Sequence, residues 1–215
     1  SYVLTQDSVG SGIYLTHDPV RGKTGWSYRL SVTMDFNNDG VAEEYTAACT
    51  MPEKLKVDSF NITKKKVGEY TLYSLNISAQ DQENEENYYF GKYSINGVWY
   101  QKISKYIEFN DVSLNGLYVK NLSVWNFNDI QDKSKFSDDD AKDMVFLTSG
   151  DSMVVEFSNI SKAYFNFIDD CAHQKNGSNP MFGGPPANIS TNISNGARGF
   201  FTAYAVSTVG GKAPE

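Results

Sequence analysis

The sequence predicts an all-β protein with one amphipathic helix. Three observations support this prediction. Short segments in which apolar and polar residues alternate recur along most of the chain, Gly, Asn, Asp and Pro separate them at short intervals, and a single segment repeats its apolar residues at helical spacing. Short strands at such spacing are typical of a β-sandwich or a barrel-like sheet. We therefore expect one of these two architectures.

The first quarter of the chain is predicted to contain a β-hairpin. Apolar and polar residues alternate between 26 and 34 and again between 44 and 51. A side-chain period of two is typical of strands that bury one face. Pro52 ends the pair, because proline has no N–H to donate to a β-ladder. A domain boundary is therefore expected near residues 52–54.

More strands are expected after this boundary, over residues 55–62, 67–78, 88–95, 98–108, 115–125, 143–149, 152–157 and 200–208. Turn signals separate several of them, at Asn96-Gly97, Asn115-Gly116 and residues 149–151. The polar stretch at 80–87 is interpreted as a solvated connection, and residues 129–143 as a long surface loop that can include one helical turn.

One segment departs from the strand pattern. After Ser161, apolar residues recur at steps of three and four as far as Cys171, which predicts an amphipathic helix over 161–174. Ser161 is suited to cap its N-terminus, and Asn176-Gly177 to end it. A tract rich in Gly, Pro and Asn, residues 178–199, follows before the last expected strand.

Charge and hydropathy exclude two classes of function. The chain has 26 Asp and Glu against 19 Lys and Arg, a net charge of -7, whereas nucleic-acid binders usually present a basic face. The densest basic stretch, Lys64-Lys65-Lys66, is three residues long and is interpreted as a solvated turn. No apolar run approaches the roughly 18 residues that span a bilayer, so no transmembrane helix is expected.

Catalysis has little support in the sequence. His17 and His173 are its two histidines, so a zinc site or a Ser-His-Asp triad is not expected. The acidic runs Asp138–Asp140 and Asp169-Asp170 are interpreted as surface charge. Cys49 and Cys171 are interpreted as small core residues in preference to one disulfide bond. We assign no catalytic residue and interpret the protein as non-enzymatic.

The most specific motif is a candidate calcium loop. Oxygen-bearing side chains stand at its first, third and fifth positions, a glycine at the sixth allows a sharp turn, and the seventh offers a backbone carbonyl. The usual glutamate at position twelve is replaced by Thr46, so Glu43 or Glu44 would have to complete the ligand shell. The candidate Ca²⁺ ligands are Asp35, Asn37, Asp39, Val41 and Glu44.

The alternative for the same residues is an acidic hairpin loop. In that case Asp39-Gly40 provides the residues with positive φ that the turn requires, and no ion is bound. The aromatic residues also have two interpretations. Trp26, Trp99, Trp125 and the cluster Tyr88-Tyr89-Phe90 are suited to stacking on a sugar or a peptide, but packing in the core or on a sheet face is the preferred interpretation.

Several stretches taken in order resemble a known family. Near the N-terminus they are Gly12-Ile13-Tyr14, the run from Arg21 to Val32, and Tyr45-Thr46-Ala47 running into Met51-Pro52. Further along they are Gly150 to Val155, Ile160 to Tyr164, Asn179 to Phe182, Pro185-Pro186, Ser190 to Ile193 and Asn195 to Phe201. Together they resemble the Bacteroidetes lipoproteins grouped as domain-of-unknown-function family 4249.

The resemblance implies an exported protein, lipidated at an N-terminal cysteine and anchored by that lipid to one face of the outer membrane. It implies no catalytic residue. It also implies that residues 1–53 are the last strands of an incomplete immunoglobulin-like sandwich and that residues 54–215 form a β-rich C-terminal domain. The strands at 26–34 and 44–51 should then show an exposed edge or apolar face. The loop at 35–44 is longer than the turn usual at this place in the family. The resemblance therefore does not support binding of calcium by this loop.

The expected function is that of an accessory or ligand-binding lipoprotein, associated with a TonB-dependent outer-membrane transporter in nutrient uptake. Its ligand, a small molecule, a glycan or a peptide, is not specified by the sequence. The alternative is a structural or adhesive surface protein that mediates protein–protein contacts. A deep pocket or an exposed aromatic platform would favour the first function, and an open edge strand or a flat apolar patch the second.

Overall fold

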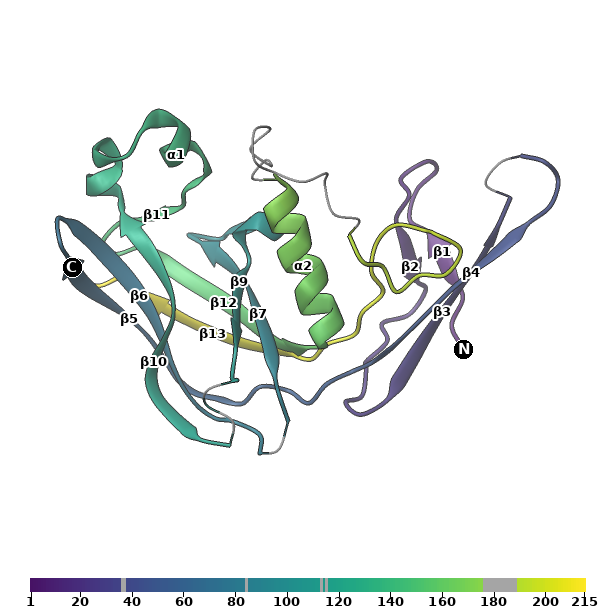
Figure 1. Ribbon diagram of the computed structural model, residues 1–215, viewed down its shortest axis with the longest axis horizontal. Helices are drawn as coiled ribbons and strands as arrows, with labels where there is room; N and C mark the ends of the chain where they lie inside the picture. The colour runs from purple at the N-terminus through teal and green to yellow at the C-terminus, as the bar shows by residue number, and fades with distance from the viewer. Residues whose placement is uncertain (36–37, 84, 113, 115, 176–188) are drawn as a thin grey trace.

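The computed structural model describes residues 1–35, 38–83, 85–112, 114, 116–175 and 189–215. Within these residues the protein is mostly β, as the sequence predicts, and its strands form four sheets (Figure 1). Two of these sheets pack against each other as a β-sandwich, and the other two are small two-stranded ribbons near the N-terminus.

The first sheet of the sandwich has the strand order β11-β10-β6-β5. Its strands are β5 (Val57–Val67), β6 (Tyr70–Gln80), β10 (Tyr118–Asp129) and β11 (Phe146–Leu147). The second sheet has the order β13-β12-β7-β8, and β9 also pairs with β7. Its strands are β7 (Tyr88–Ile95), β8 (Val98–Tyr100), β9 (Ile107–Asn110), β12 (Ser152–Ile160) and β13 (Val206–Lys212).

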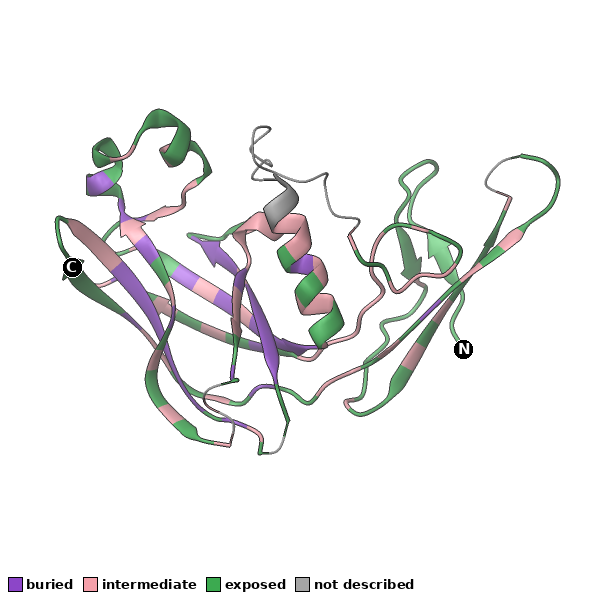
Figure 2. Ribbon diagram, in the orientation of Figure 1, coloured by how far each residue is buried: buried purple, intermediate pink, exposed green. Residues whose placement is uncertain are grey.

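The core of the sandwich is built from alternate residues of both sheets. Side chains of successive strand residues point to opposite faces, so every second residue of β6 and of β12 enters the core. The buried side chains from these two strands are Tyr73, Leu75, Ile77, Ala79, Met153, Val155 and Phe157. Figure 2 shows the buried residues concentrated along β6, β7 and β12.

The predicted helix forms a third layer. Helix α2 (Lys162–Lys175) packs on the outer face of the second sheet, where Ile168 contacts Tyr88 and Phe90 of β7 (Figure 1). Its N-terminus is capped as the sequence predicts, since Ser161 Oγ accepts a hydrogen bond from the Tyr164 N–H at 3.2 Å. Because α2 covers one face of β7 and the sandwich covers the other, β7 is buried on both sides.

The N-terminal residues form two ribbons beside the sandwich (Figure 1). One consists of β1 (Leu4–Gln6) and β2 (Tyr14–Thr16), and the other of β3 (Ser27–Met34) and β4 (Glu43–Thr50), which is the predicted hairpin. Among the described residues of the first 53, Ala47 alone is buried. The exposed edge and apolar face expected for these strands are present, and the assignment of residues 1–53 to an incomplete sandwich stays a prediction.

The predicted element boundaries differ from the structure at several places. Lys64, Lys65 and Lys66, interpreted as a solvated turn, lie within strand β5 and pair with β6. The strand expected over 98–108 is divided into β8, the 3₁₀ turn η1 (Ile103–Lys105) and β9. The strand expected over 143–149 is reduced to the two residues of β11. The loop expected over 129–143 instead holds the 3₁₀ helix η2 (Ile130–Lys135) and helix α1 (Asp138–Asp143), each with an acceptor side chain at its N-cap, Asp129 and Ser137.

The last predicted strand begins too early, because β13 starts at Val206 and not at residue 200. Two contacts explain the difference. The ring of Phe200 packs against Tyr164 and Phe167 of α2. Phe201 exchanges its backbone hydrogen bonds with the side-chain amide of Asn192, at 2.7 and 2.8 Å, and so joins no strand ladder.

Candidate functional site

The candidate calcium loop is closed by its own carboxylates. Asp35 accepts hydrogen bonds from the backbone N–H of Asp39 at 3.1 Å and of Gly40 at 2.9 Å, and Asp39 Oδ1 accepts one from the Val41 N–H at 2.8 Å. Gly40 has a φ of +85°, as the turn interpretation requires. Asn37 lies outside the described residues.

The fifth candidate ligand of this loop, Glu44, is on β4. Its carboxylate accepts a hydrogen bond at 2.9 Å from Ser31 Oγ, which belongs to the neighbouring strand β3 and not to the loop. The described side chains of the loop are therefore held by the local turn and ribbon contacts. These contacts are the ones that a plain turn would have. Binding of Ca²⁺ by this loop remains a prediction.

His17 and the two cysteines form no common site in the described part of the chain. His17 is exposed, beside Asp18 at 3.3 Å. Cys49 and Cys171 are free thiols and half-buried, and burial raises the pKa of both, which keeps them protonated and weakly nucleophilic. Among the residues that the structure describes, no group of three or more His, Cys, Asp or Glu side chains could hold a metal ion.

The aromatic residues singled out from the sequence are mostly packed. Tyr88 and Phe90 lie under α2, and Tyr89 stacks on Phe109 inside the sandwich, with their ring centroids 5.0 Å apart. Trp125 is partly buried against the same core. Trp26 and Trp99 are exposed, and the Lys23 ammonium lies over the Trp26 ring at 4.8 Å. The preferred interpretation, packing, therefore fits the cluster on β7 and Trp125.

One cluster of rings holds a lysine of the chain itself. The Lys92 ammonium lies 5.6–5.8 Å from the rings of Phe90, Tyr106 and Tyr204, and it donates a hydrogen bond to the Tyr204 hydroxyl at 3.3 Å. Cation–π attraction stabilises this arrangement. Because Lys92 itself is the cation beside these rings, we interpret the cluster as a packing feature of the α2 layer.

A hollow of ligand size is formed by described residues near the end of β10. It measures about 540 Å³, within the range of small-molecule sites, and lies between η2 and α1 at the molecular surface. Its lining is mixed in polarity and consists of Ile130, Gln131, Lys133, Ser134, Phe136, Asp138 and Ala141. Most of these side chains are exposed, so a bound ligand would bury little surface.

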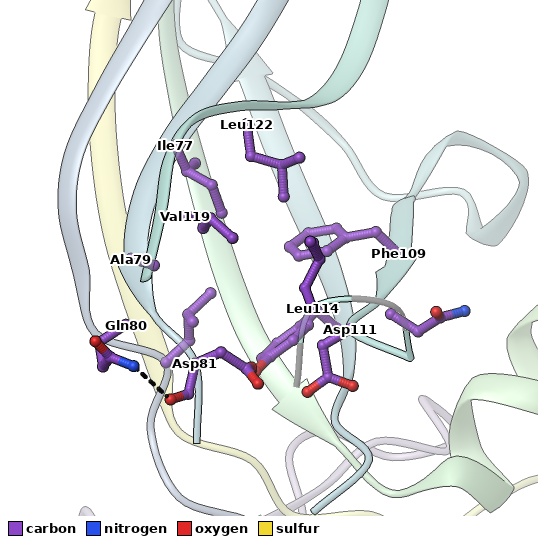
Figure 3. Close-up of a pocket in the computed structure, with 12 residues that line it drawn as sticks. Ile77, Ala79, Gln80, Asp81, Phe109, Asp111, Leu114, Val119 and Leu122 are labelled. Carbon is purple, nitrogen blue, oxygen red and sulfur yellow. Dashed lines mark hydrogen bonds between the residues drawn. The ribbon is translucent and has the colours of Figure 1, made fainter. Parts of the chain in front are cut away.

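A second, smaller cavity lies at one end of the sandwich (Figure 3). Its volume is about 30 Å³, room for one or two waters, and most of its lining is apolar, including Ile77, Phe109 and Leu122. Two acidic residues stand at its end, Asp81 after β6 and Asp111 after β9. The sequence interpretation missed them, because they lie 30 positions apart, Asp81 in a polar stretch expected to be solvated and Asp111 between two expected strands.

Both acidic side chains are buried, with 8 and 4% of Asp81 and Asp111 exposed. Burial raises the pKa of Asp111 to about 6. The hydrogen bond from the Asn87 N–H lowers this pKa, and the neighbouring Asp81 carboxyl raises it. Burial also raises the pKa of the Tyr89 hydroxyl, which donates to Asp81 Oδ1 at 3.2 Å. This end of the sandwich therefore holds titratable groups away from water.

Exposed apolar surface is concentrated at the N-terminus. Twelve of the twenty large apolar side chains that are exposed among the described residues belong to residues 1–41. Val32 and Met34 of β3 are among them, and β3 pairs with β4 alone within the described strands. An open edge strand beside exposed apolar side chains is a typical site for pairing with another strand.

The comparisons with known proteins identify a family and no individual relative. Residues 1–209 match the family described as Domain of unknown function (DUF4249). Comparisons with curated proteins and with solved structures gave no match. In the described part of the chain, no helix has the length and apolar character needed to cross a membrane. Since the match extends over nearly the whole sequence, this chain belongs to the DUF4249 family.

Proposed function

We propose that this protein is a non-enzymatic accessory lipoprotein of the outer membrane, and that it works by binding another protein, a TonB-dependent transporter, through strand β3. The family resemblance supports the location and the partner. The observation that carries the binding mode is the open edge of β3 beside exposed apolar side chains.

The two edges of the β3–β4 ribbon differ, and the difference supports β3 as the binding edge. Along the outer edge of β4, the backbone carbonyls of Glu44, Thr46 and Ala48 accept hydrogen bonds from Asn195, Ser194 and Asn192. The outer edge of β3 has no such partner among the described residues. Its unpaired N–H and C=O groups fit an added strand, so the occupant we propose is a strand of the transporter.

The side chains of β3 fit the same occupant. Val32 and Met34 are 39 and 44% exposed, and covering them would remove apolar surface from water. A structural or adhesive surface protein would use the same edge with a different partner. A ligand-binding function would instead use the hollow between η2 and α1, whose exposed and mixed lining gives it weaker support than β3.

The test compares two valines of nearly equal exposure. Val32→Lys places a charge on β3, whereas Val206→Lys places the same charge on β13, where Val206 is 37% exposed. Each variant is expressed as the native lipidated protein, cross-linked in its own membrane and recovered. We expect the transporter to be recovered with the wild-type protein and with Val206→Lys, but not with Val32→Lys.

Two outcomes would contradict the proposal. Equal recovery of the transporter with both variants would show that β3 is not the contact. A fall in the melting temperature of Val32→Lys alone would show that strands of the same polypeptide cover β3, as an immunoglobulin-like sandwich predicts. Recovery of surface or matrix proteins in place of a transporter would favour the structural or adhesive function.

A further inference from the structure

The buried end of the sandwich holds two acidic side chains that face each other. Figure 3 shows the carboxyl groups of Asp81 and Asp111 converging at one end of the cavity. They come from different sheets, since Asp81 follows β6 and Asp111 follows β9. The sandwich itself, and not a flexible loop, therefore brings them together.

The hydrogen bonds at this end leave two acceptor atoms unused. Asp81 accepts from the Tyr89 hydroxyl at 3.2 Å and from the Gly116 N–H at 2.8 Å. Asp111 Oδ1 accepts from the Asn87 N–H at 2.8 Å. Within the described part of the chain, Asp111 Oδ2 and Asn87 Oδ1 are buried and have no hydrogen-bond partner.

Asn87 lies directly beside Asp111. Besides the contact to Oδ1, the Asp111 N–H donates to the Asn87 carbonyl at 3.3 Å, so the N–H of each residue bonds to the other residue. Each has only 4% of its surface exposed. Buried polar atoms are nearly always satisfied, so two unused oxygen acceptors on paired, buried residues indicate a missing electropositive partner.

The charge at this end is also unbalanced. The ion pairs between described residues involve Lys64, Lys135, Lys162 and His17, and none of them reaches Asp81 or Asp111. An ionised carboxylate buried without a counter-charge costs several kcal/mol, and two adjacent carboxylates also repel each other. A bound cation would remove both penalties and would use the free oxygen atoms.

We propose that this end of the sandwich is a calcium site, in which Asp81, Asp111 and Asn87 Oδ1 are the side-chain ligands. Carboxylate and amide oxygens are the ligands of hard divalent cations. The two carboxylates match the charge of one such ion. Ca²⁺ fits better than Mg²⁺, because Mg²⁺ usually keeps several waters and the cavity has room for one or two.

This site is separate from the loop at residues 35–44, and the experiment must distinguish the two. The probe is CaCl₂, with MgCl₂ and a chelator as comparisons, at pH 7.5. Two matched substitutions each replace one acid by its amide: Asp111→Asn in the proposed site and Asp35→Asn in the loop. The measurements are the melting temperature and calorimetric titration with Ca²⁺.

We expect Ca²⁺ to raise the melting temperature of the wild-type protein and of Asp35→Asn, and to leave that of Asp111→Asn unchanged. Titration should give Ca²⁺ binding that Asp111→Asn weakens more than ~10-fold, since even outer partners of metal ligands contribute 10- to 100-fold. If Asp111→Asn does not fold, Asp81→Asn and Asn87→Ala take its place, with the same expected loss.

Three results would overturn the proposal. The first is a wild-type protein that neither binds Ca²⁺ nor melts at a higher temperature with it. The second is a Ca²⁺ effect that Asp35→Asn abolishes and Asp111→Asn retains, which would assign the ion to the loop. The third is an equal effect of MgCl₂, which would overturn the choice of Ca²⁺.

Discussion

The backbone N–H of Ser194 donates a hydrogen bond to the Thr46 carbonyl at 2.9 Å, and the Thr46 N–H donates to Ser194 Oγ at 2.8 Å. This pair joins residues 148 positions apart, and it fastens the segment before β13 to the N-terminal ribbon. Backbone and side-chain groups of residues 192–195 thus bond to an edge of β4 with which a strand would otherwise pair. Within the described strands, the ribbon is left with one open edge, that of β3.

Ser194→Ala should loosen this junction locally. The substitution removes the acceptor of the Thr46 N–H, and a hydrogen bond of about 0.5–1.5 kcal/mol corresponds to roughly 2- to 10-fold faster exchange of that amide. Hydrogen–deuterium exchange measures the effect at Thr46. Ser190→Ala, an exposed serine of the same segment, is the control and should leave the exchange of Thr46 unchanged. Equal exchange in both variants would contradict the proposed role of Ser194.

The same junction shows what the sequence could and could not predict. Strands β3 and β4 were predictable, because alternation is a local signal that the ribbon preserves. The docking of residues 189–203 was not, since it depends on single side chains such as Asn192 and on no repeated pattern. Asp81 and Asp111 were missed for a related reason. Each stands in a polar segment, and only the packing of two sheets buries them together.

Gly91→Ala should destabilise the sandwich. Gly91 pairs with Phe157 across β7 and β12, and a Cβ at this position would lie 3.1 Å from the Phe157 ring and 3.3 Å from Ile107 Cβ. Such overpacking of a core costs about 1–3 kcal/mol. Urea unfolding measures the loss.

A double-mutant cycle provides the control for Gly91. Phe157→Leu removes the ring that the new methyl group would meet, so the cost of Gly91→Ala should be smaller in that background. An equal cost in both backgrounds would show that contact with Phe157 is not the cause.

The loop at residues 35–44 has its own test. If it binds Ca²⁺, part of the Ca²⁺-dependent rise in melting temperature should persist in Asp111→Asn. Asp39→Ala should abolish that part. If it is a plain turn, Asp39→Ala removes the hydrogen bond from the Val41 N–H and leaves every effect of Ca²⁺ unchanged. Melting curves with CaCl₂ and with chelator distinguish these outcomes.

The pH dependence of stability tests the burial of Asp111, with chelator present so that no Ca²⁺ contributes. The pKa of Asp111 is raised in the folded state from 3.8 to about 6, so between these values the folded protein holds a proton that the unfolded chain releases. The unfolded state therefore binds fewer protons, and stability falls as the pH rises through this window. The fall amounts to at most about 3 kcal/mol and is complete above pH 6.

Asp111→Asn should remove this fall. The amide keeps an oxygen that can accept from the Asn87 N–H, but it carries no charge to desolvate. We expect the variant to be more stable than the wild-type protein at pH 7.5, and the difference between their unfolding free energies to shrink from pH 6 to pH 4. Asp58→Asn, at an exposed position of β5, should instead follow the wild-type curve. Parallel curves for the wild-type protein and Asp111→Asn would show that Asp111 is ionised at little cost in the folded state.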